Sequence, residues 1–272
     1  MTFSEIWSLG YFFEKYPNIH TIGSKPWVVA VLICAVIAYL LGSINCGVLI
    51  SRMYGKDIRN VGSGNAGATN MTRTFGKKAG AFTFVGDFAK ASVALAACRL
   101  MFGLEGAFVA GIFCIVGHAY PLYFKFKGGK GVVCIAAMGL FTTPLVLVIM
   151  LAIFAVILFG FKMVSFASIM TMIIYPYVLF QLEGYGPWIL YASIAALFVV
   201  FLHRKNIVRI FNHTESKISL GKKSKASDTK AVNTEKQKIS VEKCSGCGAD
   251  VVIENGIGEC TYCGKKVNKG GN

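Results

Sequence analysis

Residues that could bind or activate an anion gather in short polar segments of an otherwise apolar chain. The first segment, residues 61–73, reads VGSGNAGATNMTR. Its glycines let the backbone bend toward a ligand, and its hydroxyl and amide groups offer short donors. Thr69 and Arg73, four residues apart, share a face of what looks like a helix start. The pattern predicts an anion cradle; a flexible linker with helix-capping residues is the alternative. The candidate ligands are Gly62, Ser63, Gly64, Asn65, Thr69 and Arg73.

A second segment, residues 117–131, reads GHAYPLYFKFKGGKG. Lys130, with Gly128 and Gly129 before it, could present its ammonium beside exposed amides to a phosphate. The run is not a Walker A loop, which would need glycine at Phe124 and a hydroxyl residue at Gly131. His118 is a candidate base, although a single histidine at a helix end is more often a hydrogen-bonded structural group.

A third cluster, residues 203–209, reads HRKNIVR and closes the last apolar run. Its charge is also typical of a positive-inside membrane anchor. Asn206 is the exception, because its uncharged amide could bind a substrate hydroxyl at the membrane surface. Asp87 and Lys90, three apart within an apolar run, are expected to pair or to reach a cytoplasmic pocket.

The C-terminus carries two CxxC pairs, each followed by glycine and separated by twelve residues. Such pairs supply four thiolates in a tetrahedron, which predicts a structural zinc ribbon. A disulfide is disfavoured because cytoplasmic thiols stay reduced. The predicted ligands are Cys244, Cys247, Cys260 and Cys263.

The composition places these segments in a membrane protein. Hydrophobic residues make up 55% of the 272 residues and charged residues 15%, with a formal net charge of +15. This balance excludes collagen, a chain disordered throughout and a disulfide-stapled secreted fold. The apolar runs fall at 27–50, 79–103, 106–124, 131–161, 163–182 and 186–202.

The positive-inside rule decides how often the run 131–161 crosses the membrane. Loops 51–78 and 125–130 hold six and three basic residues and should be cytoplasmic. The tail from His203, with 14 basic side chains, joins them only if 131–161 crosses twice, breaking near Pro144. We therefore expect an all-α polytopic fold of about seven segments, with one short helix sheltered by its neighbours. The N-terminus would be outside and the C-terminus cytoplasmic.

Four parts are expected along the chain. Residues 1–26 lack a secretory signal and suit either an interfacial helix or a frayed terminus. Residues 27–215 form the membrane domain, 216–240 a basic disordered linker, and 241–272 the zinc ribbon.

Four motifs in order resemble one family, the bacterial membrane glycerol-3-phosphate acyltransferases known as PlsY. The motifs are Gly42-Ser43-Ile44 with Gly47, the run 57–70 with Arg73, the run 117–131, and His203-Arg204-Lys205-Asn206-Ile207 with Arg209. The resemblance covers residues 32–216 and implies seven helices with a cytoplasmic site. Asn45-Cys46 and Val133-Cys134 depart from the family pattern, and the zinc ribbon lies outside it.

The resemblance implies a reaction in which a hydroxyl of glycerol 3-phosphate attacks acyl phosphate, giving lysophosphatidic acid and phosphate. This is the first committed step of phospholipid synthesis. Ser63, Thr69, Arg73 and Lys130 would hold phosphate. The base would be His118 or a substrate phosphate oxygen. Positioning and charge stabilisation can supply much of the acceleration, because acyl phosphate is already activated. The candidate catalytic residues are Ser63, Arg73, His118, Lys130 and Asn206.

No catalytic cofactor is expected, and zinc is expected only as a structural ion. Membrane lipid is an expected partner, and a protein could bind through the ribbon. Nucleic acid is not expected, because basic and acidic residues balance there and Tyr262 is its one aromatic residue. Two other classes remain open: a transporter of phosphorylated metabolites, and a membrane scaffold that recruits a partner through the ribbon. The transporter should show matching broken helices in two halves, and no internal repeat is visible.

Overall fold

The computed structural model describes residues 10–11, 24–218, 240–248, 250–253, 257–259, 263–264 and 266–268. The chain divides into two units, Met1–Ser219 and Leu220–Asn272. Apart from residues 10–11 and 24–26, the predicted N-terminal segment 1–26 lies outside the described residues. So does residue range 219–239 of the predicted linker.

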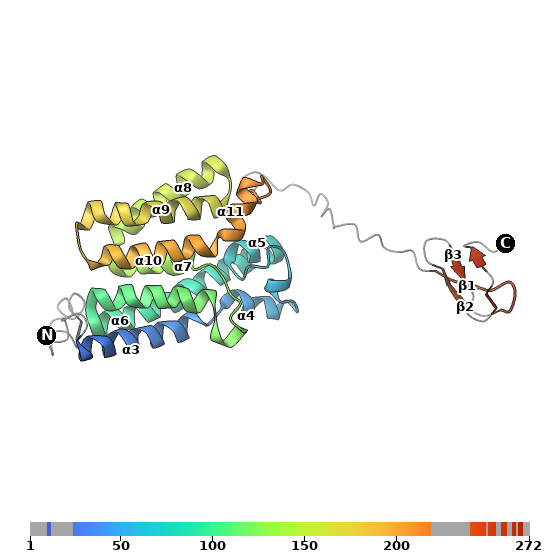
Figure 1. The fold of residues 1–272 in the computed structure, drawn as a ribbon, viewed down its shortest axis with the longest axis horizontal. Helices are drawn as coiled ribbons and strands as arrows, with labels where there is room; N and C mark the ends of the chain where they lie inside the picture. The colour runs from blue at the N-terminus through green and yellow to red at the C-terminus, as the bar shows by residue number, and fades with distance from the viewer. Residues whose placement is uncertain are drawn as a thin grey trace. The chain divides into compact units, whose positions relative to one another are not determined.

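The first unit is helical over its described residues (Figure 1). Its helices are α3 (Lys25–Gly42), α4 (Cys46–Met53), α5 (Ala68–Phe75), α6 (Lys77–Ala119), α7 (Val132–Thr142), α8 (Pro144–Phe161), α9 (Val164–Glu183), α10 (Pro187–Leu202) and α11 (Arg204–Phe211), with short 3₁₀ turns at Ile58–Asn60 and Leu122–Phe124. Ser24 caps α3 by accepting a hydrogen bond from Trp27 N at 3.3 Å, and Pro26 lies in its first turn.

Within the described residues, four helical segments are long and apolar enough to cross a bilayer. They are Lys25–Met53, Lys77–Phe124, Pro144–Phe161 and Val164–Glu183. A fifth is gained if α10 and α11, which meet at a 58° bend, are taken together. The expectation of a multi-pass helical membrane fold is therefore confirmed at this coarser level.

Helix α6 is two antiparallel helices in one. Phe102 and Gly103 have non-helical backbone angles, and Gly103 has a φ of 61°. Lys90 Nζ lies 3.0 Å from His118 Nδ1, although a straight helix would separate the two residues by about 42 Å. The chain thus reverses at Phe102–Gly103, at the junction of the apolar runs 79–103 and 106–124.

Helix α7 ends abruptly at the expected break before Pro144. It is 11 residues long, and the last carbonyls of a helix have no partners within the helix. Thr143 N donates to Gly139 O at 3.0 Å, and the Arg99 side chain from α6 donates to Phe141 O. These contacts, together with burial against α6, provide the shelter that the short helix was expected to need.

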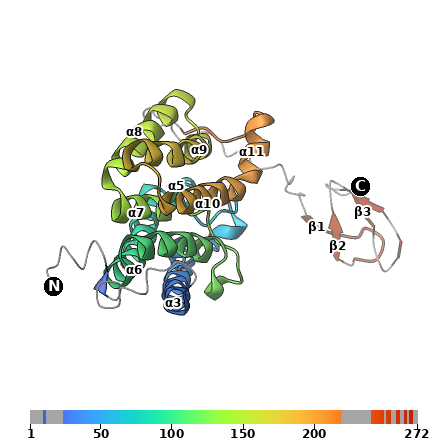
Figure 2. The same cartoon turned by 60° about the vertical axis from the view of Figure 1, so that its left-hand side comes forward.

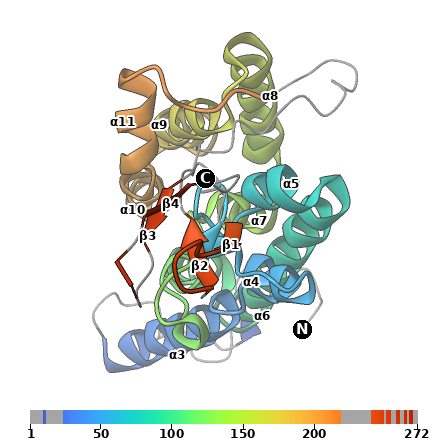
Figure 3. The same cartoon turned by 90° about the vertical axis from the view of Figure 1, so that its right-hand side faces the viewer.

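The helices pack in the order α3, α6, then α7 and α10, with α9 and α8 beyond them (Figures 1 and 2). Small residues allow close contact between α3 and α6: a Cβ at Gly42 would lie 2.5 Å from Cys114 O, and one at Gly117 would lie 2.4 Å from Tyr39 O. The short helices α4, α5 and α11 gather at one end of the bundle, which faces the viewer in Figure 3. That end carries all three sequence segments singled out for anion binding.

The second unit contains two antiparallel strand pairs among its described residues. Strand β1 (Ser240–Lys243) pairs with β2 (Asp250–Ile253), and β3 (Ile257–Glu259) pairs with β4 (Lys266–Asn268). Gly248 and Gly264, each directly after a CxxC cysteine, have φ values of 74° and 70°. Cys244, Val251 and Val267 form a small buried cluster.

Candidate functional site

A pocket of about 710 Å³ opens at the end of the first unit where α5, α9 and α11 meet the two predicted loops. This size is typical of a small-molecule site. The three sequence segments all contribute to its wall. The predicted residues that line it are Gly62, Ser63, Asn65, Thr69, Arg73, His118, Lys130 and Asn206.

Asn70 holds the first loop in its pocket-facing shape. Its Oδ1 accepts Ser63 N at 3.0 Å, and its Nδ2 donates to the carbonyls of Val61 and Asn65, both at 3.0 Å. The side chain is only 2% exposed. Sequence reasoning did not assign Asn70 this role, because its partners lie on a loop whose path the sequence does not give.

The position of Gly62 leaves no room for a side chain. It has a φ of 61°, and a Cβ there would lie 2.3 Å from Asn70 Oδ1. Gly64 also has a positive φ, of 70°, but it is not part of the pocket wall. Its N–H donates to Val61 O at 3.1 Å, so the structure gives Gly64 a turn-forming position rather than a ligand-facing one.

Helix α5 presents Thr69 and Arg73 to the pocket, as their spacing predicts. Arg73 also reaches across the opening, where Nη2 donates to Ser216 O at 3.3 Å. The guanidinium therefore contacts the chain segment that follows α11.

Gly128 and Gly129 fasten the second loop to the end of α6. Gly128 N donates to Ala119 O and Gly129 N to His118 O, both at 3.0 Å. A Cβ at Gly128 would lie 2.0 Å from His118 O, so the backbones touch. These amides were expected to bind phosphate, but here they are already bonded and lie outside the pocket wall. The pair instead brings the loop close enough to α6 for Lys130 to enter the pocket.

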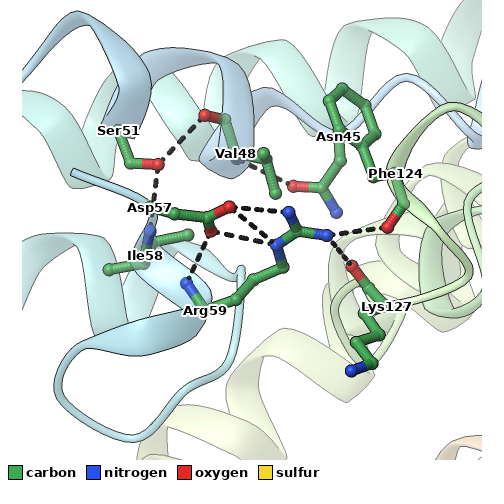
Figure 4. Close-up of polar contacts among 8 residues, drawn as sticks. All are labelled: Asn45, Val48, Ser51, Asp57, Ile58, Arg59, Phe124 and Lys127. Carbon is green, nitrogen blue, oxygen red and sulfur yellow. Dashed lines mark hydrogen bonds and ion pairs between the residues drawn. The ribbon is translucent and has the colours of Figure 1, made fainter. Parts of the chain in front are cut away.

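A clamp on the opposite side of this loop comes from Arg59 (Figure 4). Its guanidinium pairs with Asp57 at 2.6 Å and donates to Phe124 O at 2.7 Å and Lys127 O at 3.4 Å. The hydrogen bonds from Arg59 hold the pKa of Asp57 below its usual value. Arg59 thus ties the first loop to the turn before the glycines, where Lys125 and Phe126 have φ values of 56° and 55°.

Lys130 and Asn206 meet on the wall opposite α5. Lys130 Nζ donates to Asn206 Oδ1, while Asn206 Nδ2 donates to Ser165 Oγ at 2.6 Å and to Glu215 Oε1 at 2.9 Å. Burial lowers the pKa of Lys130 to about 8, and the nearby cations Arg209 and Arg73 act in the same direction against the attraction of Glu215.

Glu215 orders this wall and was not singled out from the sequence. It accepts hydrogen bonds from Arg209 Nε at 2.7 Å and from Ser165 Oγ at 2.8 Å, besides the one from Asn206. Burial alone would raise its pKa, but these hydrogen bonds lower it overall. The only signal in the sequence is a lone acid six residues after Arg209.

His118, Asp87 and Lys90 form a buried cluster at the base of the pocket. Lys90 Nζ lies 2.8 Å from Asp87 Oδ1 and 3.0 Å from His118 Nδ1. The expected Asp87–Lys90 pair is therefore confirmed, and Asp87 also reaches the pocket wall.

A second, narrow cavity of about 60 Å³ continues from the pocket between α7, α8 and α9. Its wall is mainly apolar, with Ile135, Leu147 and Met172 among its residues. Val132, Phe154 and Ser168 line both cavities. A polar, cationic pocket thus adjoins an apolar groove that runs among membrane helices.

Three of the four predicted metal ligands lie in described parts of the second unit. The Sγ atoms of Cys244, Cys247 and Cys263 are within 4.8 Å of one another, and Cys244 and Cys263 are 3.5 Å apart. Gly246 N lies 3.4 Å from Cys244 Sγ. Cys260 lies outside the described residues, as does Tyr262. The cluster is compatible with a bound metal ion.

Comparison with known proteins adds an independent line of evidence. The model of the family described as "Glycerol-3-phosphate acyltransferase" matches residues 32–213. The enzyme of that name from Bacillus subtilis (strain 168) is 40% identical over 195 residues, which cover 70% of this chain and 98% of that protein. The one from Neisseria meningitidis serogroup C (strain 053442) is 38% identical and covers 67% of this chain and 94% of its own length.

Two solved structures of PlsY (YgiH), an integral membrane glycerol 3-phosphate acyltransferase, share the fold at 34% identity. Its glycerol 3-phosphate form has a TM-score of 0.67 and covers 70% of this chain and 96% of that chain. Its lysophosphatidic acid form has a TM-score of 0.64 and covers 70% and 95%. The resemblance inferred from the four motifs is thereby confirmed: this chain belongs to the glycerol-3-phosphate acyltransferase family and is a multi-pass membrane acyltransferase.

Proposed function

We propose that the protein transfers a fatty acyl group from acyl phosphate to a hydroxyl of sn-glycerol 3-phosphate, the first committed step of phospholipid synthesis. One observation carries this proposal: the cationic pocket and the apolar groove share Val132, Phe154 and Ser168. A donor with a phosphate head and a hydrocarbon chain matches that junction. The pocket volume of about 710 Å³ also leaves room for the small acceptor.

The residues of the pocket have distinct roles in this proposal. Ser63, Thr69, Arg73 and Lys130 hold and neutralise phosphate, with Gly62 and Asn65 shaping the first loop. Asn206 orients a substrate oxygen from the opposite wall. The acceptor oxygen bonds to the acyl carbon, the bond from that carbon to the phosphate oxygen breaks, and phosphate leaves. The hydroxyl proton goes to His118 or to a phosphate oxygen.

This chemistry needs no catalytic cofactor, because the mixed anhydride is already activated. Fixed donors around the pocket need only orient the substrates and stabilise developing negative charge. The cations Arg73, Lys130 and Arg209 all reach the pocket wall, which supports that assignment.

Seven membrane segments fit the chain best. The reversal at Phe102–Gly103 makes α6 two crossings, and the half-length α7 with α8 accounts for two more segments. The basic residues of loops 51–78 and 125–130 favour a cytoplasmic position for the pocket. The proposed orientation has the N-terminus outside and the C-terminus inside, in a bacterial plasma membrane.

The cysteine cluster is proposed to hold structural zinc in a ribbon that spans 241–272. With Zn–S bonds of 2.3 Å, tetrahedral geometry separates the sulfurs by about 3.8 Å. The 3.5 Å between Cys244 and Cys263 fits this value. Cys260 would complete the ligand set. We also propose that the ribbon serves as a contact for a protein partner, since it lies outside the family match at 32–213.

Phosphate release tests the acyltransferase activity. Purified protein in lipid vesicles is given palmitoyl phosphate with and without glycerol 3-phosphate. Release should require both substrates and fall at least about 100-fold in Arg73→Ala. Arg204→Ala is a matched control, because Arg204 packs over Phe201 and is not in the pocket wall. Absence of release from folded wild-type protein would refute the enzyme and favour the transporter.

A truncation after Ser219 tests the ribbon separately. It keeps Ile218, whose N–H donates to Lys162 O at 2.7 Å, and so leaves the pocket rim intact. Full-length protein should contain one zinc per chain and the truncated protein none, with equal acyl transfer. Zinc that persists after truncation would place the metal elsewhere.

A further inference from the structure

The ionisable side chains of Asp87, Lys90 and His118, which cluster at the base of the pocket, are almost fully buried. The side chains of Lys90, Asp87 and His118 are 5%, 2% and 5% exposed. Asp87 and Lys90 come from the first half of α6 and His118 from the second half. Asp87 and His118 nevertheless line the pocket, so the cluster touches the space where substrate would bind.

All three N–H groups of a charged Lys90 have an acceptor. They point to Asp87 Oδ1 at 2.8 Å, to Ile44 O, and to His118 Nδ1 at 3.0 Å. An ammonium group has three donors and no acceptor, so Nδ1 must accept in the contact with His118. The charge on Lys90 is favoured because its partner Asp87 would otherwise be a buried, uncompensated carboxylate.

This contact determines the position of the proton on His118. An imidazole that accepts at Nδ1 and is neutral carries its hydrogen on Nε2. An ammonium 3.0 Å away also opposes protonation at Nδ1. Nε2 faces the second loop, since a Cβ at Gly129 would lie 2.0 Å from that atom. The ring therefore presents a hydrogen-bond donor beside the loop that carries Lys130.

We propose that Lys90, held by Asp87, is a positioning residue that locks His118 as an Nε2–H donor to a phosphate oxygen in the pocket. His118 then does not take the proton of the attacking hydroxyl. This inference rests on the proposed acyl transfer and deepens it, because it removes one of the two proton acceptors left open above. Lys90 and Asp87 act through His118 and need not touch substrate.

Solid-state NMR reads the tautomer directly. Wild-type protein with ¹⁵N-labelled histidine is placed in lipid at neutral pH, without acyl phosphate, and then given inorganic phosphate. His118 should show a bare Nδ1 and a protonated Nε2, and its Nε2 signal should move on phosphate addition. A proton on Nδ1, a doubly protonated ring or an Nε2 signal that ignores phosphate would overturn the proposal.

Assignment needs a variant, because the chain has four histidines. The His118 signals are those missing from His118→Gln and retained in His213→Gln. His213 is exposed, follows α11 and is absent from the pocket wall. If His118→Gln does not fold, a correlation between labelled Lys90 Nζ and Nδ1 in wild type gives the same assignment.

Two substitutions of His118 distinguish a role as hydrogen-bond donor from a role as general base. Glutamine can place an N–H near the position of Nε2 but cannot accept a proton at neutral pH, whereas alanine does neither. His118→Gln should keep acyl transfer within about tenfold of wild type, and His118→Ala should lose about 100-fold or more. Equal losses would restore the role of base.

Lys90→Met tests the positioning role. Without the ammonium, His118 should populate both neutral tautomers, and kcat should fall with less change in KM. If folded Lys90→Met protein still carries the His118 hydrogen only on Nε2, Lys90 does not fix the tautomer and the proposal is refuted. Because the tautomer is read without acyl phosphate, this outcome is independent of whether the proposed reaction occurs. A wild-type protein that fails to release phosphate would instead refute the proposed function itself.

Discussion

Glu215 and Arg209 face each other across the rim of the pocket, with Oε2 2.7 Å from Nε. The carboxylate side chain is 4% exposed and the guanidinium side chain 35%. Glu215 thus places a negative charge in a wall that also carries the cations Arg73, Lys130 and Arg209. The Glu215 carboxylate orients the side chains of Asn206 and Arg209, because both donate hydrogen bonds to it.

Glu215→Gln should therefore weaken substrate binding and turnover together. The change removes the charge that Arg209 and Asn206 bond to, each such bond contributing about 1.5–3 kcal/mol. A fall of about tenfold or more in kcat/KM is expected in the phosphate-release assay. Glu183→Gln, at the exposed end of α9, is the control and should match wild type. A more active Glu215→Gln would show that the carboxylate blocks the site.

Gly129→Ala should abolish activity through one added methyl group. The new Cβ would lie 2.0 Å from His118 Nε2, too close for both groups to keep their places. Either the His118 ring or the loop must then shift, and both groups line or position the pocket wall. Gly160→Ala is the matched control, since a Cβ there meets nothing within 4 Å. The measurement is phosphate release by the two variants in lipid, and normal activity of Gly129→Ala would contradict the packing described here.

Activity should decline on the alkaline side as Lys130 loses its proton. The pKa of Lys130 is lowered to about 8, so its charged form, which is proposed to attract phosphate, dominates below that pH and is lost above it. KM for glycerol 3-phosphate should rise as the pH passes about 8, by up to tenfold per pH unit. In Lys130→Arg, which stays charged, this rise should move to higher pH. An unchanged profile in Lys130→Arg would assign the alkaline limb to another group.

Arg59→Met should loosen the second loop without removing any group from the pocket wall. The change breaks the bonds to Phe124 O and Lys127 O and leaves Asp57 without its partner. We expect kcat to fall about tenfold, because Lys130 is then less well held. Lys56→Met, which removes an exposed cation nearby, should have little effect. Loss of folding in Arg59→Met, seen in a thermal unfolding scan, would mean that the clamp supports the whole fold.

The sequence predicts the elements of the site better than their contacts. Runs of apolar residues and the placement of basic loops indicate a helical membrane fold, and Pro144 marks the end of α7. The spacing of Thr69 and Arg73 correctly places both on α5. Such features are local, because they depend on residues within a few positions of one another.

Contacts between distant segments could not be read in this way. Lys90 and His118 meet because α6 reverses at Phe102–Gly103. The separate apolar runs 79–103 and 106–124 predict that reversal, but they do not show which side chains it brings together. The role of Asn70 was missed for the same reason, since its side chain bonds to three backbone groups that come together only in the folded loop. Gly128 looked like a phosphate ligand because glycine next to lysine is typical of anion loops, yet its N–H is bonded to Ala119 O.

The shared wall of Val132, Phe154 and Ser168 has a consequence for kinetics. If the donor is acyl phosphate, as proposed, it reaches this junction by lateral diffusion within the bilayer, whereas glycerol 3-phosphate arrives from water. For the lipid-soluble donor the relevant concentration is then its mole fraction in the membrane. Diluting it with inert lipid should slow turnover at constant bulk amount, while the acceptor still follows ordinary solution saturation. The rate would thus depend on a surface concentration for the proposed donor and on a bulk concentration for glycerol 3-phosphate.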